Sequence, residues 1–113
     1  MQFIYENNEA NIYIRQDINT PDAAANLVRS YAMYAVSLPT NQTVHVFVKD
    51  DVSIPFETMF QIYAAVRSTK NIHAGVNHLV IHISNDFTVK CCNRLFAIIQ
   101  PSIKVTLETC KAF

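Results

Sequence analysis

The chain has 113 residues, of which half are hydrophobic and 16% are charged. This length suits a single domain with one core, and the composition excludes an intrinsically disordered chain. Nine basic residues balance nine acidic ones and no Lys/Arg run occurs, which argues against a nucleic-acid partner. A net charge near zero leaves little repulsion between copies of the chain, so a homodimer is one expectation.

The cysteines and the first residues indicate a cellular compartment. Cys91, Cys92 and Cys110 are odd in number and two of them are adjacent, which is typical of a reducing environment rather than of a disulfide framework. The opening MQFIYENNEANIYI lacks the basic start and apolar run of a secretory signal, and no window approaches 18 apolar residues. The sequence therefore predicts a cytoplasmic protein without membrane insertion.

The first 39 residues predict a hairpin followed by a helix. Two β-rich runs within QFIYENNEANIYIRQ flank a polar loop from Glu6 to Asn11. Thr20 is then a candidate N-cap, with Pro21 at the first helical position and Asp22 in the first turn. The helix should end at Pro39 and carry an inward stripe at three- and four-residue steps, formed by Ala24, Leu27, Val28, Tyr31, Tyr34 and Leu38.

The middle of the chain predicts a buried strand and a second helix. TVHVFVK, residues 43–49, is nearly continuous in apolar and β-branched residues and predicts a central strand buried on both faces. PFETMFQIYAAVRST, residues 55–69, then predicts a helix. Its inward stripe should consist of Phe56, Met59, Phe60, Tyr63 and Val66.

The last third predicts two more strands around a third helix. HLVIHIS, residues 78–84, is a second strand of the doubly buried type, and IKVTLE, residues 103–108, alternates like a strand with one solvated face. Between them residues 85–100 predict a helix that turns Cys92, Leu95, Phe96 and Ile99 inward. We expect Cys91 and Cys92 to be buried small hydrophobic residues rather than nucleophiles.

The predicted order is β-β-α-β-α-β-α-β in one α/β domain over residues 1–113. Strands that alternate with helices favour right-handed crossovers and a mixed, mostly parallel sheet, with one antiparallel strand from the initial hairpin. The loops after Lys49 and Ser84 both leave carboxyl ends of strands, where open α/β sheets usually bind ligands and partners.

This element order resembles that of the small STAS domains, typified by anti-sigma-factor antagonists and by the cytoplasmic tails of sulfate transporters. The resemblance implies a STAS-like fold and a regulatory module without enzymatic activity, whose partner is a protein such as a kinase or a transcription regulator. Phosphorylatable members carry an Asp-Ser-Ser-Gly-type turn at the second helix. Here Pro55, Phe56, Glu57 and Thr58 stand at those four positions, so the acceptor serine is absent and Glu57 would supply a permanent charge.

Two groups of polar residues are candidates for metal chemistry. Asp50 and Asp51 follow one central strand, and Asn85 and Asp86 follow the next, so the four could meet at one edge and hold Mg²⁺. Helix capping is the more common use of such residues and is the interpretation we favour. His45 and His82 lie within the central strands, where we expect hydrogen-bonded, half-buried side chains rather than metal ligands.

We therefore expect a non-enzymatic protein-binding module that uses the second helix and the loop before it, with no cofactor and no metal. Among the helix aromatics Phe56 is the best candidate for an exposed anchor, and acidic residues around it would orient a basic partner. The predicted partner-binding residues are Asp50, Asp51, Ser53, Phe56, Glu57 and Phe60. The alternatives are a small-ligand module for a nucleotide or lipid at the same edge, and a metal-assisted hydrolase using Asp50, Asp51 and Asp86.

Overall fold

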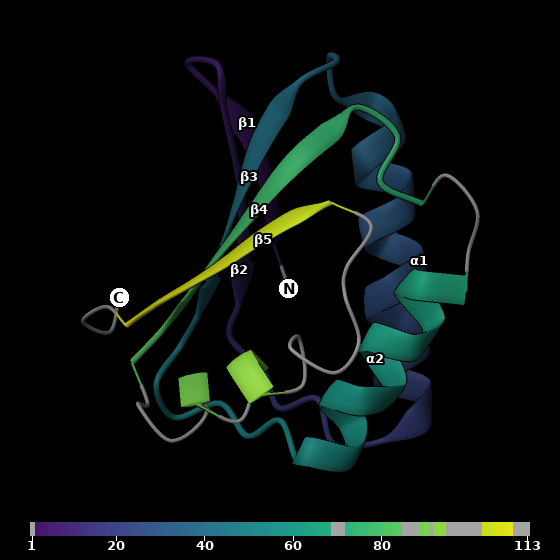
Figure 1. The fold of residues 1–113 in the computed structure, drawn as a ribbon, viewed down its shortest axis with the longest axis vertical. Coiled ribbons are helices and arrows are strands. Elements are labelled where there is room, and N and C mark those ends of the chain that lie inside the picture. Colours follow the sequence, from purple (N-terminus) through teal and green to yellow (C-terminus); the bar gives the residue numbers. More distant parts are fainter. Residues whose placement is uncertain (1, 69–71, 85–88, 91, 95–102, 110–113) are drawn as a thin grey trace.

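The computed structural model describes residues 2–68, 72–84, 89–90, 92–94 and 103–109. Within these residues five strands form one sheet, and two helices pack against it (Figure 1). The strands lie side by side in chain order: β1 (Gln2–Glu6), β2 (Glu9–Ile14), β3 (Gln42–Val48), β4 (Val76–Ile83) and β5 (Lys104–Thr109). The helices are α1 (Pro21–Ser37), between β2 and β3, and α2 (Phe56–Ser68), between β3 and β4.

The strand directions confirm the predicted mixed, mostly parallel sheet. β1 is antiparallel to β2, and the pairs β2–β3, β3–β4 and β4–β5 are all parallel. The initial hairpin turns more tightly than predicted, because only Asn7 and Asn8 separate its strands. Both have positive φ, 53° and 64°, the conformation of a type I′ hairpin turn, which asparagine tolerates well.

Both helices lie on the same face of the sheet (Figure 1). This follows from the strand order, because each parallel strand is added beside its predecessor and right-handed crossovers of that kind always return on one side. The core forms between this face and the helices. Its most deeply buried members are Ala10 and Ile12 of β2, Val44 of β3 and Ala35 of α1.

The prediction that helices sandwich β3 and β4 is not met among the described residues, because α1 and α2 both lie on one face of the sheet. Side chains alternate along each strand, so His45 and Phe47 of β3 and His82 of β4 point away from α1 and α2. They are partly buried, and no helix among the described residues lies over them. We call this side of the sheet the open face.

The start of α1 follows the prediction. Thr20 has extended backbone, and its hydroxyl oxygen accepts a hydrogen bond from the Ala23 amide at 3.1 Å. Pro21 is the first helical residue and Asp22 lies in the first turn. This cap and proline fix the point where the chain leaves β2 and turns back across the sheet.

α2 is rotated relative to the predicted stripe. Met59, Ile62 and Val66 face the sheet, whereas Phe56 and Phe60 are 52% and 45% exposed. The helix buries the aliphatic side chains at three- and four-residue steps and turns these two phenylalanines toward solvent. The inward placement predicted for Phe56 and Phe60 in the stripe is therefore wrong, whereas the choice of Phe56 as an exposed aromatic side chain is confirmed.

The predicted third helix is described only in part. Residues 89–90 and 92–94 are helical, and Cys92 is buried with its Sγ 3.5 Å from the Met59 sulfur, as expected of a small hydrophobic residue. The other named positions lie outside the described residues: Asn85, Asp86, Cys91, Leu95, Phe96, Ile99 and Cys110. Over the part of the chain that is described, no helix combines the length and hydropathy needed to cross a membrane.

Candidate functional site at the start of the second helix

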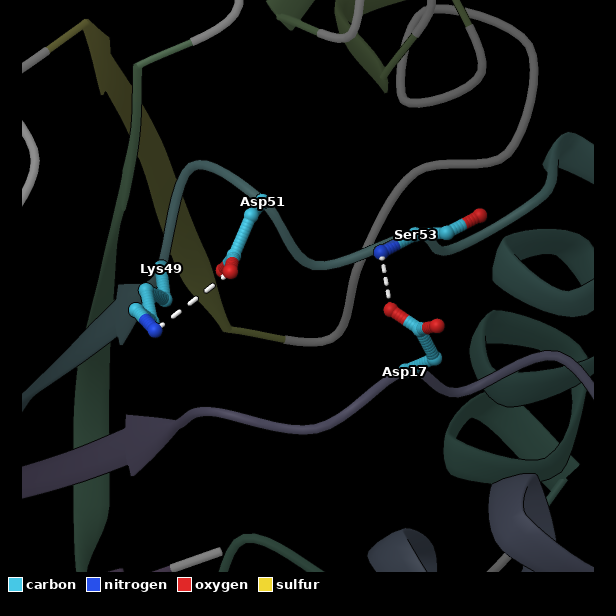
Figure 2. A network of polar contacts seen from close by, with 4 residues as sticks. All are labelled: Asp17, Lys49, Asp51 and Ser53. Carbon is cyan, nitrogen blue, oxygen red and sulfur yellow. Dashed lines mark hydrogen bonds and ion pairs between the residues drawn. The ribbon is translucent and has the colours of Figure 1, made fainter.

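The chain leaves β3 through a tight turn. The Lys49 carbonyl accepts from the Val52 amide at 3.0 Å, which places Asp50 and Asp51 at the middle of the turn. The Lys49 ammonium lies 3.4 Å from Asp51 Oδ2, and both side chains are well exposed (Figure 2). Such an exposed pair adds little stability, about 0–1 kcal/mol, and holds the geometry of the turn loosely.

The capping role expected for Asp50 and Asp51 is wrong. α2 begins at Phe56, several residues further along, and the Pro55 carbonyl accepts the first helical hydrogen bond from the Met59 amide at 2.9 Å. The two aspartates lie between the end of β3 and the loop that follows it, and not at the start of α2. Their carboxylates are exposed.

The loop that follows is tied to the segment after β2. The Ser53 amide donates to Asp17 Oδ1 at 2.7 Å (Figure 2). The Ser53 carbonyl accepts from the Ile18 amide at 3.0 Å. Ile18 is 5% exposed, so one end of this link is anchored in the core. Asp17 was not singled out from the sequence, because its role depends on bringing two loops together that lie 36 positions apart.

Beyond this anchored loop α2 exposes two aromatic rings. Phe56 and Phe60 are four positions apart and therefore on one side of the helix, with the exposed Glu57 beside them. The start of α2 lies at the same end of the molecule as the carboxyl ends of the parallel strands (Figure 1). The six predicted partner-binding residues lie in the loop after β3 and in the first turns of α2. We call Asp50, Asp51, Ser53, Phe56, Glu57 and Phe60 the α2 surface.

The described residues give no support for a metal at this edge. No group of three or more His, Cys, Asp or Glu side chains among them could hold an ion. Asn85 and Asp86, the other half of the predicted magnesium set, lie outside the described residues.

An apolar cavity of about 200 Å³ lies between the sheet and the two helices. At its wall the Tyr31 hydroxyl and His73 Nδ1 are 2.7 Å apart in a buried hydrogen bond. Burial raises the pKa of the Tyr31 phenol and lowers the pKa of the His73 imidazole. The phenol therefore keeps its proton and the ring stays neutral, which makes the pair a structural contact rather than an acid and base exchanging a proton.

Rings form a row on the open face, across three neighbouring strands. Tyr13 stacks on Phe47 with ring centroids 5.2 Å apart, and Phe47 stacks on His82 at 4.5 Å. His45 Nδ1 lies 3.0 Å from His82 Nε2, which confirms the prediction of hydrogen-bonded, half-buried histidines. His82 Nδ1 also lies 3.5 Å from Glu108 Oε2.

The protonation of His82 depends on this packing. Burial lowers its pKa most, the neighbouring His45 lowers it further, and the Glu108 carboxylate acts in the opposite direction. The sequence did not reveal the row. The available signal was that rings and polar groups alternate with aliphatic residues in TVHVFVK, a pattern typical of a strand with two different faces.

Comparisons of this chain with protein-family models, with curated proteins and with solved structures find no significant match.

Proposed function

We propose that this domain is a non-enzymatic binding module that holds a basic segment of a partner protein on the α2 surface. The observation that carries the proposal is the exposure of Phe56 and Phe60, at 52% and 45%, on one side of a helix. Large aromatic side chains of this kind supply most of the affinity at protein interfaces when a partner buries them.

The charges around the two rings favour a basic partner. Asp50, Asp51 and Glu57 are exposed carboxylates, and Lys49 is the cation that pairs with one of them, Asp51. A rim of one sign orients an oppositely charged partner and raises its association rate, whereas the buried rings determine how long it stays. The proposed partner segment is therefore basic and carries an apolar residue to contact Phe56.

The anchored loop lowers the cost of binding. Hydrogen bonds through Ser53 to Asp17 and Ile18 hold the loop in place before any partner arrives. Less conformational freedom is then lost on association, which is the usual advantage of a preorganised surface.

The resemblance of the element order to STAS domains supports a regulatory role for this surface. In that family the corresponding turn and helix receive a partner kinase or regulator. Glu57 stands where a phosphate would be added, so in this chain the negative charge would be permanent and binding would not be switched by a kinase. We propose constitutive binding to a partner of this regulatory class.

Affinity purification from the source cells with mass spectrometry tests the proposal. A Phe56→Ala, Glu57→Lys variant should lose the partners retained by the wild type. The matched control is Met33→Ala with Glu6→Lys, which removes an exposed apolar side chain and reverses a charge outside the α2 surface. This control should retain the partners. Urea unfolding midpoints equal to that of the wild type would show that both variants fold. An unchanged partner set for the Phe56 variant would contradict the proposal.

The apolar cavity favours a second candidate function, the binding of a small lipid. An apolar ligand in this space would cover aliphatic side chains of the sheet and of both helices and remove them from water. Thermal unfolding with a series of fatty acids should then show a midpoint that rises with ligand concentration. A Val66→Trp variant, which fills the cavity, should abolish the rise, and an unchanged midpoint in the wild type would count against this function.

A further inference from the structure

The sheet ends on one side at β5. Its inner side pairs with β4 in parallel, and among the described residues no strand lies beyond its outer side (Figure 1). The backbone amides and carbonyls that point away from β4 therefore form a row that meets no neighbouring strand there. Such a row can bind an extended strand from another chain.

The side chains of β5 divide between the two faces of the sheet. Val105 and Leu107 line the apolar cavity beneath the helices, so Lys104, Thr106 and Glu108 belong to the open face. Lys104 and Glu108 are the only charged residues of this strand, and both are exposed. They carry opposite signs four positions apart, with Thr106 midway between them.

Both charges are available to a partner strand. Lys104 has no ion pair within the described part of the chain. Glu108 Oε2 lies 3.5 Å from His82 Nδ1, yet the Glu108 side chain is 55% exposed. Burial and the neighbouring His45 lower the pKa of His82 against the opposing effect of Glu108, so the ring is neutral at pH 7 and leaves the carboxylate charge uncompensated.

We propose that β5 pairs with β5 of a second copy of this chain, antiparallel and about a two-fold axis that crosses the sheet at Thr106. In this register Lys104 of each copy lies opposite Glu108 of the other, and Val105 lies opposite Leu107. Each attraction occurs twice, because a two-fold interface repeats every contact. The two sheets then form one continuous sheet, with the helices of both copies on the same side.

The two charges select this arrangement over the alternatives. A parallel pairing in register would set Lys104 against Lys104 and Glu108 against Glu108. Any other antiparallel register leaves Lys104 and Glu108 without each other. The opposite edge of the sheet offers no such match, since Glu6 is the only charged residue of β1. Charged side chains on an edge strand usually discourage pairing, whereas here they favour one partner and one register.

The size of the contact predicts a weak dimer. A paired strand of about six residues on each copy falls at the low end for specific interfaces, below about 1,200 Å². The formal net charge is zero, so two copies approach without long-range repulsion. We therefore expect a dissociation constant on the order of tens of micromolar.

Analytical ultracentrifugation of charge-reversed variants tests the register directly. Lys104→Glu opposes two pairs of glutamates across the interface, and Glu108→Lys opposes two pairs of lysines. Each variant alone should associate about tenfold or more weakly than the wild type. An equimolar mixture of the two should form a heterodimer of near wild-type affinity, because both positions then pair opposite charges again. The double variant, Lys104→Glu with Glu108→Lys, should regain association on its own for the same reason.

The matched control is Glu6→Lys, which makes the same change of charge as Glu108→Lys on the opposite edge strand. It should associate like the wild type. Both altered positions of β5 are exposed at the edge of the sheet, so the fold should tolerate the changes, and urea unfolding midpoints near that of the wild type would show that it does.

Four results would overturn the proposal. The first is a wild-type chain that sediments as a monomer up to about 1 mM, well above the expected dissociation constant. The second is undiminished association of either single variant. The third is a mixture and a double variant that associate no better than the single variants. The fourth is a Glu6→Lys control that weakens as much as Glu108→Lys. None of these substitutions touches the α2 surface, so partner binding in the affinity purification is a separate readout.

Discussion

The buried pair of Tyr31 and His73 shows how individual residues constrain this fold. Tyr31 is 7% exposed and His73 8%, and their 2.7 Å hydrogen bond joins α1 to the segment before β4. A buried polar atom that loses its partner costs more free energy than the hydrogen bond itself contributes. This contact should therefore matter more to stability than its single hydrogen bond suggests.

Replacing Tyr31 by phenylalanine should lower the free energy of unfolding by about 1–3 kcal/mol, because His73 Nδ1 then lies buried without its hydrogen-bond partner. The matched control is Tyr34→Phe, which removes a 2.7 Å hydrogen bond to the Ile4 carbonyl in a less buried setting and should cost less. Urea unfolding measures both. An equal or smaller loss for Tyr31→Phe would contradict the structural role assigned to the pair.

Stability should fall as the solution becomes acidic. The pKa values of His73 and His82 are lowered below their ordinary value of 6.5, in both cases mainly by burial. The unfolded chain therefore binds protons at a higher pH than the native one. Stability is fully present above about pH 6.5 and is lost as the pH falls through the lowered values.

Urea unfolding between about pH 7.5 and pH 5 measures this effect. In a Tyr31→Phe, His73→Leu variant one of the two titrating rings is gone, so the unfolding free energy should depend less steeply on pH. A wild-type free energy that stays constant over this range would contradict the burial assigned to the two histidines.

At the scale of elements, two adjacent residues in the loop before β4 are constrained in different ways. Gly75, the only glycine in the chain, has no positive φ, but a Cβ there would lie 2.6 Å from the Pro39 carbonyl oxygen. Its carbonyl also accepts from the Gln42 amide at 3.0 Å. Gly75 is thus required for space where the end of α1 meets the start of β4. The positive φ, 45°, falls on Ala74 instead.

These two neighbours should respond to substitution with opposite signs. Gly75→Ala should destabilise the domain by about 1–3 kcal/mol, because the backbone of Pro39 must move to admit the methyl group. Ala74→Gly should be neutral or stabilise by up to about 1 kcal/mol, because it relieves a left-handed conformation that alanine adopts poorly. Thermal unfolding of the two variants measures the difference. Destabilisation of equal size at both positions would contradict this account.

The helices and loops also show which structural features could be predicted from the sequence alone. The Thr20–Pro21–Asp22 start of α1 was predictable, because capping is decided by a few neighbouring residues. The side of α2 that faces the sheet was not, since phenylalanine and aliphatic residues at helical spacing predict the same burial. Which of Phe56 and Met59 is buried depends on the position of the sheet. The hydrogen bond from Ser53 to Asp17 likewise depends on the meeting of two loops.

At the scale of the whole molecule, the strand order decides where binding surfaces can exist. The parallel arrangement of β3 and β4 was predictable from two apolar segments joined by a helix. The sequence did not reveal that the strands follow one another across the sheet in chain order. That order puts α1 and α2 on one face and leaves the row of Tyr13, Phe47 and His82 on the other. The α2 surface and the open face are thus separate parts of one molecule.

The central claim is that α1 and α2 cover the same face of this sheet and leave the other without either helix, and thiol labelling of two adjacent positions on β3 tests it most directly. In a background without native cysteines, Thr43→Cys places a thiol on the open face, and Val44→Cys places one toward the helices, where Val44 is 0% exposed. In dilute protein we predict rapid modification at position 43 and modification at position 44 only as fast as the domain unfolds. Equally slow modification of both, in dilute folded protein, would contradict the one-sided sheet.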